Sequence, residues 1–366
     1  MPFVDLTLDE DLSRQILADI AGIVDSGAFT NGPHVAAFED AFARYCGSAH
    51  CVGLASGLDA LRLGLLAAGT QPGDEVIVPA HTFAATLEAV VQAGARPVLA
   101  DVSETDCCLD PDAADAAVTA GTRFILPVHL YGQLADLEAL ERVAADHDLV
   151  LVEDACQAHG AARAGRRAGA TGAFGAFSFY PTKNLGAFGD AGALVTDDDE
   201  LADRVRSLRE HGQRRKYEHE HLGYTARLDT IQAAVLLRKL DRLERWNEER
   251  RAAARFYDER LAGIEGLALP TVAEHSEPVW HLYVVRTRDR ERLASALEQR
   301  GIATGLHYPQ PPHLAPAYAG LGHGRGDFPV AERLANEVLS LPIYPGITEE
   351  QLSAVVDAIR DHFRSG

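Results

Sequence analysis

The alternation of short apolar runs with longer amphipathic segments is the feature that most restricts the fold of this chain. Four apolar runs follow one another at residues 74–80, 96–102, 123–130 and 149–155. Between them, apolar residues recur at helical spacing in residues 86–94, 111–120 and 134–148. Because parallel strands need a crossover connection, this alternation predicts βαβ units and a mainly parallel sheet. Residues 176–180 and 192–198 are two further predicted strands, and residues 199–212 a helix.

The pattern changes in the last third of the chain. A long amphipathic stretch from Leu228 to Leu261 predicts one helix that links two lobes. After it we expect strands at residues 280–290 and 302–308, and helices at residues 291–301, 331–341 and 348–363. Thr348 and Gln351 form a capping-box pattern at the start of the last helix. The prediction is a large α/β domain over residues 1–245 and a smaller α+β domain over residues 246–366.

The charge balance limits the possible partners. The 366 residues include 34 basic and 54 acidic residues, a net charge of −20, which disfavours binding to a nucleic acid or an anionic membrane. No apolar run is long enough to span a bilayer, and the first residues lack a basic segment followed by an apolar one. Five cysteines without a CxxC pair fit a reducing compartment. We therefore expect a cytoplasmic protein.

Lysine is rare in this chain, and one lysine has an unusual position. Of the 34 basic residues only Lys183, Lys216 and Lys239 are lysines. Lys183 lies in FSFYPTKNLG, between a predicted strand and several glycines, whereas Lys216 and Lys239 lie in charged segments where a solvated cation is expected. A lysine amine can form a Schiff base and an arginine cannot. Lys183 is therefore either a covalent anchor or a solvated loop cation.

A carboxylate ends the predicted strand at residues 149–155. Asp154 at this position needs a partner, because an unpaired buried carboxylate is costly. A cationic ring nitrogen is one such partner; the alternative is that Asp154 caps a following helix. Gln157 and His159 follow within reach of the same pocket.

Other polar and aromatic residues lie near the predicted strand ends. Ser56 and Gly57 precede an amphipathic helix, whose free N–H groups could bind a phosphate, although an ordinary N-cap is the commoner role of such a Ser. Phe83 could stack on a flat ring or belong to the core, and Ser178 offers a hydroxyl to a phosphate. A lysine, an acidic partner, an aromatic ring and a helix start are what pyridoxal phosphate (PLP) requires.

The alternative of a metal site rests on histidines. His219, His221, His307 and His313 are candidate ligands, but the first two lie in a charged run that is more often solvated. We expect no metal.

Several motifs resemble one known family. SGLDAL, GDEVIVPAHTFAAT, EDACQAHGA, FSFYPTKNLGAFGDAGALVT, GYTARLDTIQAA and GLHYP are similar to those of the DegT/DnrJ/EryC1/StrS family, over about residues 3 to 360. These are PLP-dependent sugar aminotransferases of fold type I, the aspartate aminotransferase-like class. The resemblance implies that Lys183 binds PLP covalently and that Asp154 pairs with its pyridinium nitrogen. It further implies cofactor contacts from Gln157, Phe83, Ser178, Gly57 and Leu58.

The resemblance also implies a shared active site. Family members are expected to be homodimers in which the region around residues 213–219 crosses to the partner, so Arg215 and Tyr217 are predicted to bind the sugar nucleotide there. Thr225 stands where the family commonly has an Asn that reaches the partner's PLP phosphate, and its side chain is shorter. Sugar contacts are predicted for Tyr180, Asn184, His307 and Tyr308.

The expected reaction is transamination from glutamate to a nucleotide-linked keto-sugar. The motif sequences are most similar to those of the branch that aminates C3 of dTDP-3-keto-6-deoxyhexoses, which supplies amino sugars for antibiotics or surface polysaccharides. Amination at C4 and an aminocyclitol acceptor stay open alternatives. A sugar dehydratase of this fold is disfavoured by Lys183, since that position is typically His in such enzymes. A non-catalytic binding protein is disfavoured by the intact Lys183 and Asp154.

Overall fold

The structure is a computed structural model that describes residues 1–365. The first two thirds of the chain fold around a central sheet. Four parallel strands run in the order β3 (Arg96–Ala100), β2 (Glu75–Pro79), β4 (Thr122–Ile125) and β5 (Val150–Leu151). The adjoining strands are β6 (Glu153–Asp154), β9 (Gly175–Ser178), β10 (Gly192–Thr196) and β1 (His50–Leu54). β6 and β9 are parallel, and β10 pairs antiparallel with β9 and β1. A parallel bridge between Val128 and Asp154 joins the two halves.

Helices follow the strands as the alternation predicts, so the α/β class with a mainly parallel sheet is confirmed. They are α3 (Gly57–Ala67), α4 (Ala84–Gln92), α5 (Pro111–Ala116), α6 (Leu137–Asp146) and α7 (Asp199–Arg209). Aspartates accept hydrogen bonds from the first turns of α6 and α7, which satisfies free N–H groups there. The buried strand residues and the apolar faces of these helices form one large core cluster.

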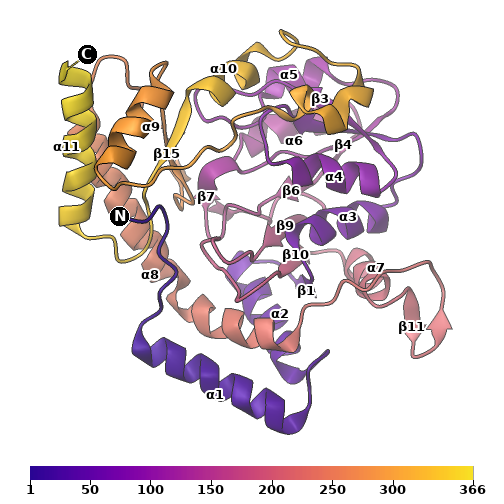
Figure 1. Ribbon diagram of the computed structural model, residues 1–366. Helices are drawn as coiled ribbons and strands as arrows, with labels where there is room; N and C mark the ends of the chain where they lie inside the picture. Colours follow the sequence, from indigo (N-terminus) through magenta and orange to yellow (C-terminus); the bar gives the residue numbers. More distant parts are fainter. Residues whose placement is uncertain (366) are drawn as a thin grey trace.

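One long helix connects the two ends of the molecule. α8 (Thr230–Leu261) begins against α2 (Pro33–Cys46) and α1 (Glu10–Ser26) and ends at α11 (Glu349–Ser365) (Figure 1). Its second half contributes Ala253, Tyr257 and Leu261 to a separate apolar cluster. The predicted boundary between residues 245 and 246 falls inside this helix, and the division into two domains stays a prediction.

The C-terminal part pairs β14 (Tyr283–Arg286) with β15 (Val338–Leu341) and packs α9 (Arg290–Gln299) and α11 beside them. The helix predicted at residues 331–341 is α10 (Pro329–Glu337), and its last four predicted residues are β15 instead. Their side chains are buried and their backbone pairs with β14, which helical periodicity does not reveal. The strand predicted at residues 302–308 is wrong, because only Gly305 pairs there, as an isolated bridge to Ser340. The capping box of Thr348 and Gln351 is confirmed.

Short elements complete the fold. The region around residues 213–219 is a hairpin of β11 (Gln213–Arg215) and β12 (Glu218–His219), which projects from the body of the molecule (Figure 1). β7 (Ala162–Arg163), β8 (Arg166–Arg167) and β13 (Ser276–Glu277) form a small sheet. Three 3-10 turns lie at η1 (Leu130–Gly132), η2 (Pro312–Leu314) and η3 (Pro316–Leu321). None of the helices in residues 1–365 combines the length and apolar character needed to cross a bilayer.

Candidate active site

Asp154 ends β6 in the middle of the sheet, with only 5% of its surface exposed. One carboxylate oxygen accepts a hydrogen bond from Thr86 Oγ1 at 2.8 Å, and the other accepts one from the Cys156 backbone at 3.2 Å. The next helix along the chain is α7, which begins at Asp199, so Asp154 does not cap a helix. A buried carboxylate with one partner on each oxygen retains the capacity to accept from a cationic group.

Gln157 is held rigidly beside Asp154. Its Oε1 accepts from the Tyr131 backbone at 2.8 Å, and its Nε2 donates to the Tyr308 hydroxyl at 3.2 Å. The Tyr308 ring lies 5.5 Å from the Phe83 ring, and burial raises the pKa of Tyr308. Phe83 is 55% exposed, so the core alternative for Phe83 is wrong within this chain. An exposed aromatic ring beside a buried carboxylate is available to cover a flat ligand.

The start of α3 lies against the end of β9. Ser56 caps the helix by accepting from the Asp59 backbone at 3.1 Å, which is the ordinary N-cap role. A Cβ on Gly57 would lie 2.7 Å from Cys156 Sγ and 2.7 Å from Ser178 Cβ, so no side chain fits there. This close approach brings the helix N–H groups next to Ser178 and next to the segment that follows Asp154.

Lys183 lies in the irregular segment between β9 and β10, where its backbone N–H donates to the Tyr180 carbonyl at 2.8 Å. Burial lowers the pKa of its amine, although Cys156 and Asp154 act in the opposite direction. Its charge in turn contributes to lowering the pKa of His159 to about 3 and of His307 to about 4, for both of which burial is the main cause. Both histidines are therefore neutral near pH 7.

Lys239 corrects an expectation. We expected a solvated cation in a charged helix, and Lys216 fits that description. Lys239 is only 7% exposed, and its Nζ donates to the Gly186 carbonyl in the Lys183 segment. Lys239 lies on the buried side of α8 because of its position in the helical repeat. The charged composition of α8 had predicted that Lys239 would be exposed to solvent. Burial lowers the pKa of Lys239 to about 8.

Asn184 has protein partners that the sequence did not predict. It is buried, its Nδ2 donates to Asn247 Oδ1 at 2.9 Å and to the Val279 carbonyl at 2.8 Å, and its Oδ1 lies 3.2 Å from His281 Nδ1. These protein partners use the amide, so the geometry favours a structural role over the predicted sugar contact.

Tyr180 and His307 lie at the rim of the same region. Tyr180 is 52% exposed, and His307 is half-buried with its Nδ1 2.8 Å from Ser340 Oγ. The His307 carbonyl accepts from the Tyr131 hydroxyl. Their contacts with a sugar stay predictions.

The hairpin residues lie apart from this pocket. Arg215 and Tyr217 are exposed, with Tyr217 at 80%. Thr225 is exposed as well, and its hydroxyl lies 3.3 Å from His211 Nε2. Among the described residues, no hydrogen bond links Thr225, Arg215 or Tyr217 to Lys183 or Asp154. Their predicted role across a dimer interface stays a prediction.

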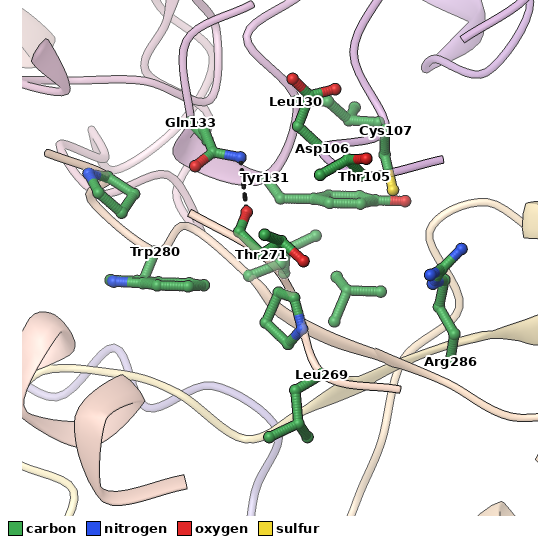
Figure 2. A pocket seen from close by; sticks show the side chains of 14 residues that line it. Thr105, Asp106, Cys107, Leu130, Tyr131, Gln133, Leu269, Thr271, Trp280 and Arg286 are labelled. Atoms are coloured by element: carbon green, nitrogen blue, oxygen red, sulfur yellow. Dashed lines mark hydrogen bonds between the residues drawn. The ribbon is translucent and has the colours of Figure 1, made fainter. Parts of the chain in front are cut away.

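Two residues near the site were missed by sequence reasoning. Thr86, which donates to Asp154, lies inside the quoted AHTFAAT motif, three residues after Phe83. Tyr131 holds Gln157 and His307 and also faces a cavity of about 40 Å³ between η1 and residues 269–286 (Figure 2). That cavity has room for waters only, so it is not the substrate site.

The residues present fit PLP. The carboxylate of Asp154 suits the ring nitrogen, Gln157 and Phe83 flank the place of the ring, and the α3 start with Ser178 suits the phosphate. The Lys183 amine makes no hydrogen bond to another residue within 1–365, so it is available for covalent attachment. In the described part of the chain, no cluster of His, Cys, Asp and Glu has the arrangement of a metal site.

Comparisons with known proteins agree with this geometry. The chain is 51% identical over 362 residues to dTDP-3-amino-3,4,6-trideoxy-alpha-D-glucose transaminase of Streptomyces venezuelae, covering 99% of this chain and 96% of that protein. The crystal structure of S. venezuelae DesV in complex with a ketimine intermediate superposes with a TM-score of 0.97 at 50% identity, covering 99% and 98% of the two chains. NtdA of Bacillus subtilis, solved with bound pyridoxamine phosphate, superposes with a TM-score of 0.93 at 32% identity. The match covers 100% of this chain and 85% of NtdA.

A family model matches nearly the whole chain, from residue 10 to residue 360. The match includes every element that builds the pocket, from the start of α3 to the Lys183 segment. The fold is that of the PLP-dependent aminotransferases. This protein belongs to the DegT/DnrJ/EryC1/StrS aminotransferase family.

Proposed function

We propose that this enzyme transfers an amino group from glutamate to C3 of a dTDP-linked 3-keto-6-deoxy sugar, with PLP as its cofactor. The observation that carries the proposal is one site in which Asp154 and Cys156 act electrostatically on Lys183 and the start of α3 packs against Cys156, in a chain half identical to a dTDP-amino-sugar transaminase. The reaction would belong to deoxyamino-sugar biosynthesis, which supplies sugars for antibiotics. It would take place in the cytoplasm.

When bound, PLP would supply an electron sink for the substrate carbanion and a carrier for the amino group between donor and acceptor. Lys183 would anchor the cofactor, and its freed amine would be the base and acid that moves the substrate proton. Its lowered pKa keeps a larger fraction of the amine neutral, and therefore basic, near pH 7. Asp154, positioned by the hydrogen bond from Thr86, would favour a proton on the ring nitrogen of bound PLP.

The cofactor phosphate is assigned to the first turn of α3. The backbone N–H groups of Gly57 and Leu58 and the hydroxyl of Ser178 are the donors we assign to it, with Ser56 supporting the turn as N-cap. Phe83 would cover the ring, and Gln157 would face its hydroxyl side.

The sugar nucleotide needs positive charge that the chain as a whole lacks. The densest basic cluster is Arg214, Arg215 and Lys216 on the β11–β12 hairpin. We propose a homodimer in which Arg215 and Tyr217 of one subunit contact the nucleotide bound at the partner subunit's pocket, with Thr225 near the partner's cofactor phosphate. Tyr180, His307 and Tyr308 would contact the sugar within one subunit.

A panel of nucleotide keto-sugars tests the acceptor. Purified enzyme with PLP and glutamate should aminate dTDP-3-keto-6-deoxy sugars with a kcat/KM at least about 100-fold above that for 4-keto isomers, UDP-linked sugars and aminocyclitol precursors, because differential contacts of roughly 3 kcal/mol separate the substrates. Product regiochemistry by NMR reads out C3 or C4. Preference for a 4-keto sugar or an aminocyclitol precursor would replace this assignment. A yellow protein that glutamate does not bleach would argue against transamination from glutamate.

A further inference from the structure

Helix α8 presents a row of polar side chains to the segment that carries Lys183. Gln232, Lys239 and Asn247 are seven and eight residues apart, about two turns each, so they lie along one side of the helix. Lys239 and Asn247 are buried and Gln232 is half-buried, although the composition of α8 is strongly charged.

Each member of this row, called the α8 polar row below, binds a different point of that segment. Asn247 Oδ1 accepts from Asn184 Nδ2 at 2.9 Å, and Lys239 Nζ donates to the Gly186 carbonyl. Gln232 Oε1 accepts from the Phe188 backbone at 2.8 Å. The three contacts fall one, three and five residues after Lys183 and therefore fix the segment immediately beyond the reactive residue.

The segment itself is folded tightly at this point. A Cβ on Gly186 would lie 2.2 Å from the Pro181 carbonyl oxygen, so the chain doubles back closely around Lys183. The Gly186 carbonyl is buried there and needs a donor, because a buried backbone group without a partner is unfavourable. Lys239 supplies that donor, and its Nζ lies 5.6 Å from the Phe188 ring centre and 6.0 Å from that of Trp246.

Asn247 extends the row to the other side of the pocket. Its Nδ2 donates to the His159 carbonyl at 2.9 Å, and His159 Nε2 donates to the Ser178 carbonyl at 2.9 Å. α8 is thus connected to the Lys183 segment and to the strand ends that carry Ser178 and Asp154. Hydrogen bonds from one helix therefore reach both parts of the site.

We propose that the α8 polar row positions Lys183 for covalent attachment to PLP, and that Lys239 is its central positioning residue. In this attachment the neutral lysine amine adds to the cofactor aldehyde carbon and one water molecule leaves. The inference rests on the PLP part of the proposed function and not on the sugar acceptor.

The test separates PLP binding from covalent attachment. Apo-protein carrying Lys239→Met is mixed with PLP, and borohydride-trapped adduct on Lys183 is quantified over time by peptide mass, beside total PLP retained. We expect PLP retention within about twofold of wild type but adduct formation slowed roughly 10- to 100-fold, as expected for an approximately 1 Å misplacement. Lys239→Arg should restore most of the rate, because it retains a donor.

Arg242→Met is the matched control. Arg242 lies three residues further on α8, and its closest ion pair is with Asp11 at 3.7 Å, away from the Lys183 segment. It should form the adduct at the wild-type rate. A folded Lys239→Met protein with a wild-type adduct rate would overturn the proposal.

A milder variant covers the case in which Lys239→Met does not fold. Gln232→Ala removes only the half-buried end of the row, and we expect a drop in adduct rate of about 3- to 10-fold, the worth of one hydrogen bond. An unchanged rate in this variant would equally overturn the proposal. A wild-type protein that forms the adduct but aminates no nucleotide sugar would refute the proposed acceptor and leave the role of α8 intact.

Discussion

The pocket around Lys183 and the hairpin of β11 and β12 are held by the chain in opposite ways. In the pocket, Asp154 is bonded by Thr86 and Cys156, and Gln157 by Tyr131 and Tyr308. On the hairpin, Arg214 reaches Glu220 at 3.4 Å with both side chains well exposed. Tyr217 has most of its surface in solvent.

The two regions differ in how firmly contacts within the chain fix their side chains. Buried polar groups must find partners, so the pocket has one geometry that the chain fixes alone. Exposed ion pairs contribute little to stability, so the contact of Arg214 with Glu220 holds the hairpin side chains only weakly. We therefore expect their function to depend on a partner subunit or a ligand.

The largest expected effect lies in the pocket. Lys183→Ala should lower turnover by about 10⁴-fold or more, because it removes both the anchor and the proton carrier. Steady-state turnover and circular dichroism should show an inactive but folded protein. A borohydride-trapped adduct retained in this variant would place the anchor on another lysine.

Asp154→Asn should have the second largest effect. The neutral amide cannot keep the ring nitrogen protonated, so we expect turnover to fall roughly 10²- to 10³-fold while PLP stays bound. The absorbance of bound PLP measures cofactor binding, and single-turnover bleaching with glutamate measures the reaction rate. Near-normal turnover would leave Asp154 with a structural role only.

The hairpin predicts a smaller effect that depends on the partner. Arg215→Ala should raise the KM for the sugar nucleotide about 10- to 100-fold, the worth of a charged hydrogen bond, without changing PLP binding. Lys183→Ala and Arg215→Ala chains are then mixed. The heterodimer should regain one working site in two, because each subunit supplies what its partner lacks. Heterodimers that regain nothing would show that Arg215 acts within its own chain.

The smallest effect concerns the stability of the apo-protein. Burial lowers the pKa of Lys183 below its usual 10.5, so the folded state binds fewer protons than the unfolded state between the two values. Stability from this group therefore rises with pH across that window. Lys183→Met should raise the melting temperature on the order of 2 °C at low pH, with the gain vanishing as pH approaches 10.5. A gain that is equal at all pH values would exclude desolvation of the amine as its cause.

Local patterns in the sequence predicted the features that local physics controls. The alternation of apolar runs and helical segments gave the parallel sheet, and the single lysine among glycines marked the pocket. The capping box of Thr348 and Gln351 was readable because both partners lie within one helical turn.

Tertiary packing decided the rest. Residues 338–341 became a strand because β14 offers a pairing edge, and Lys239 turned inward because the Gly186 carbonyl needs a donor. The amide of Asn184, for which a sugar contact is predicted, has protein partners in Asn247, Val279 and His281. In each case the partner that determines the conformation lies more than 50 residues away in the chain. The spacing of residues within a motif therefore could not predict the contact. The sequence alone determined which chemistry the chain can carry, whereas the folded structure decided which side chains hold that chemistry in place.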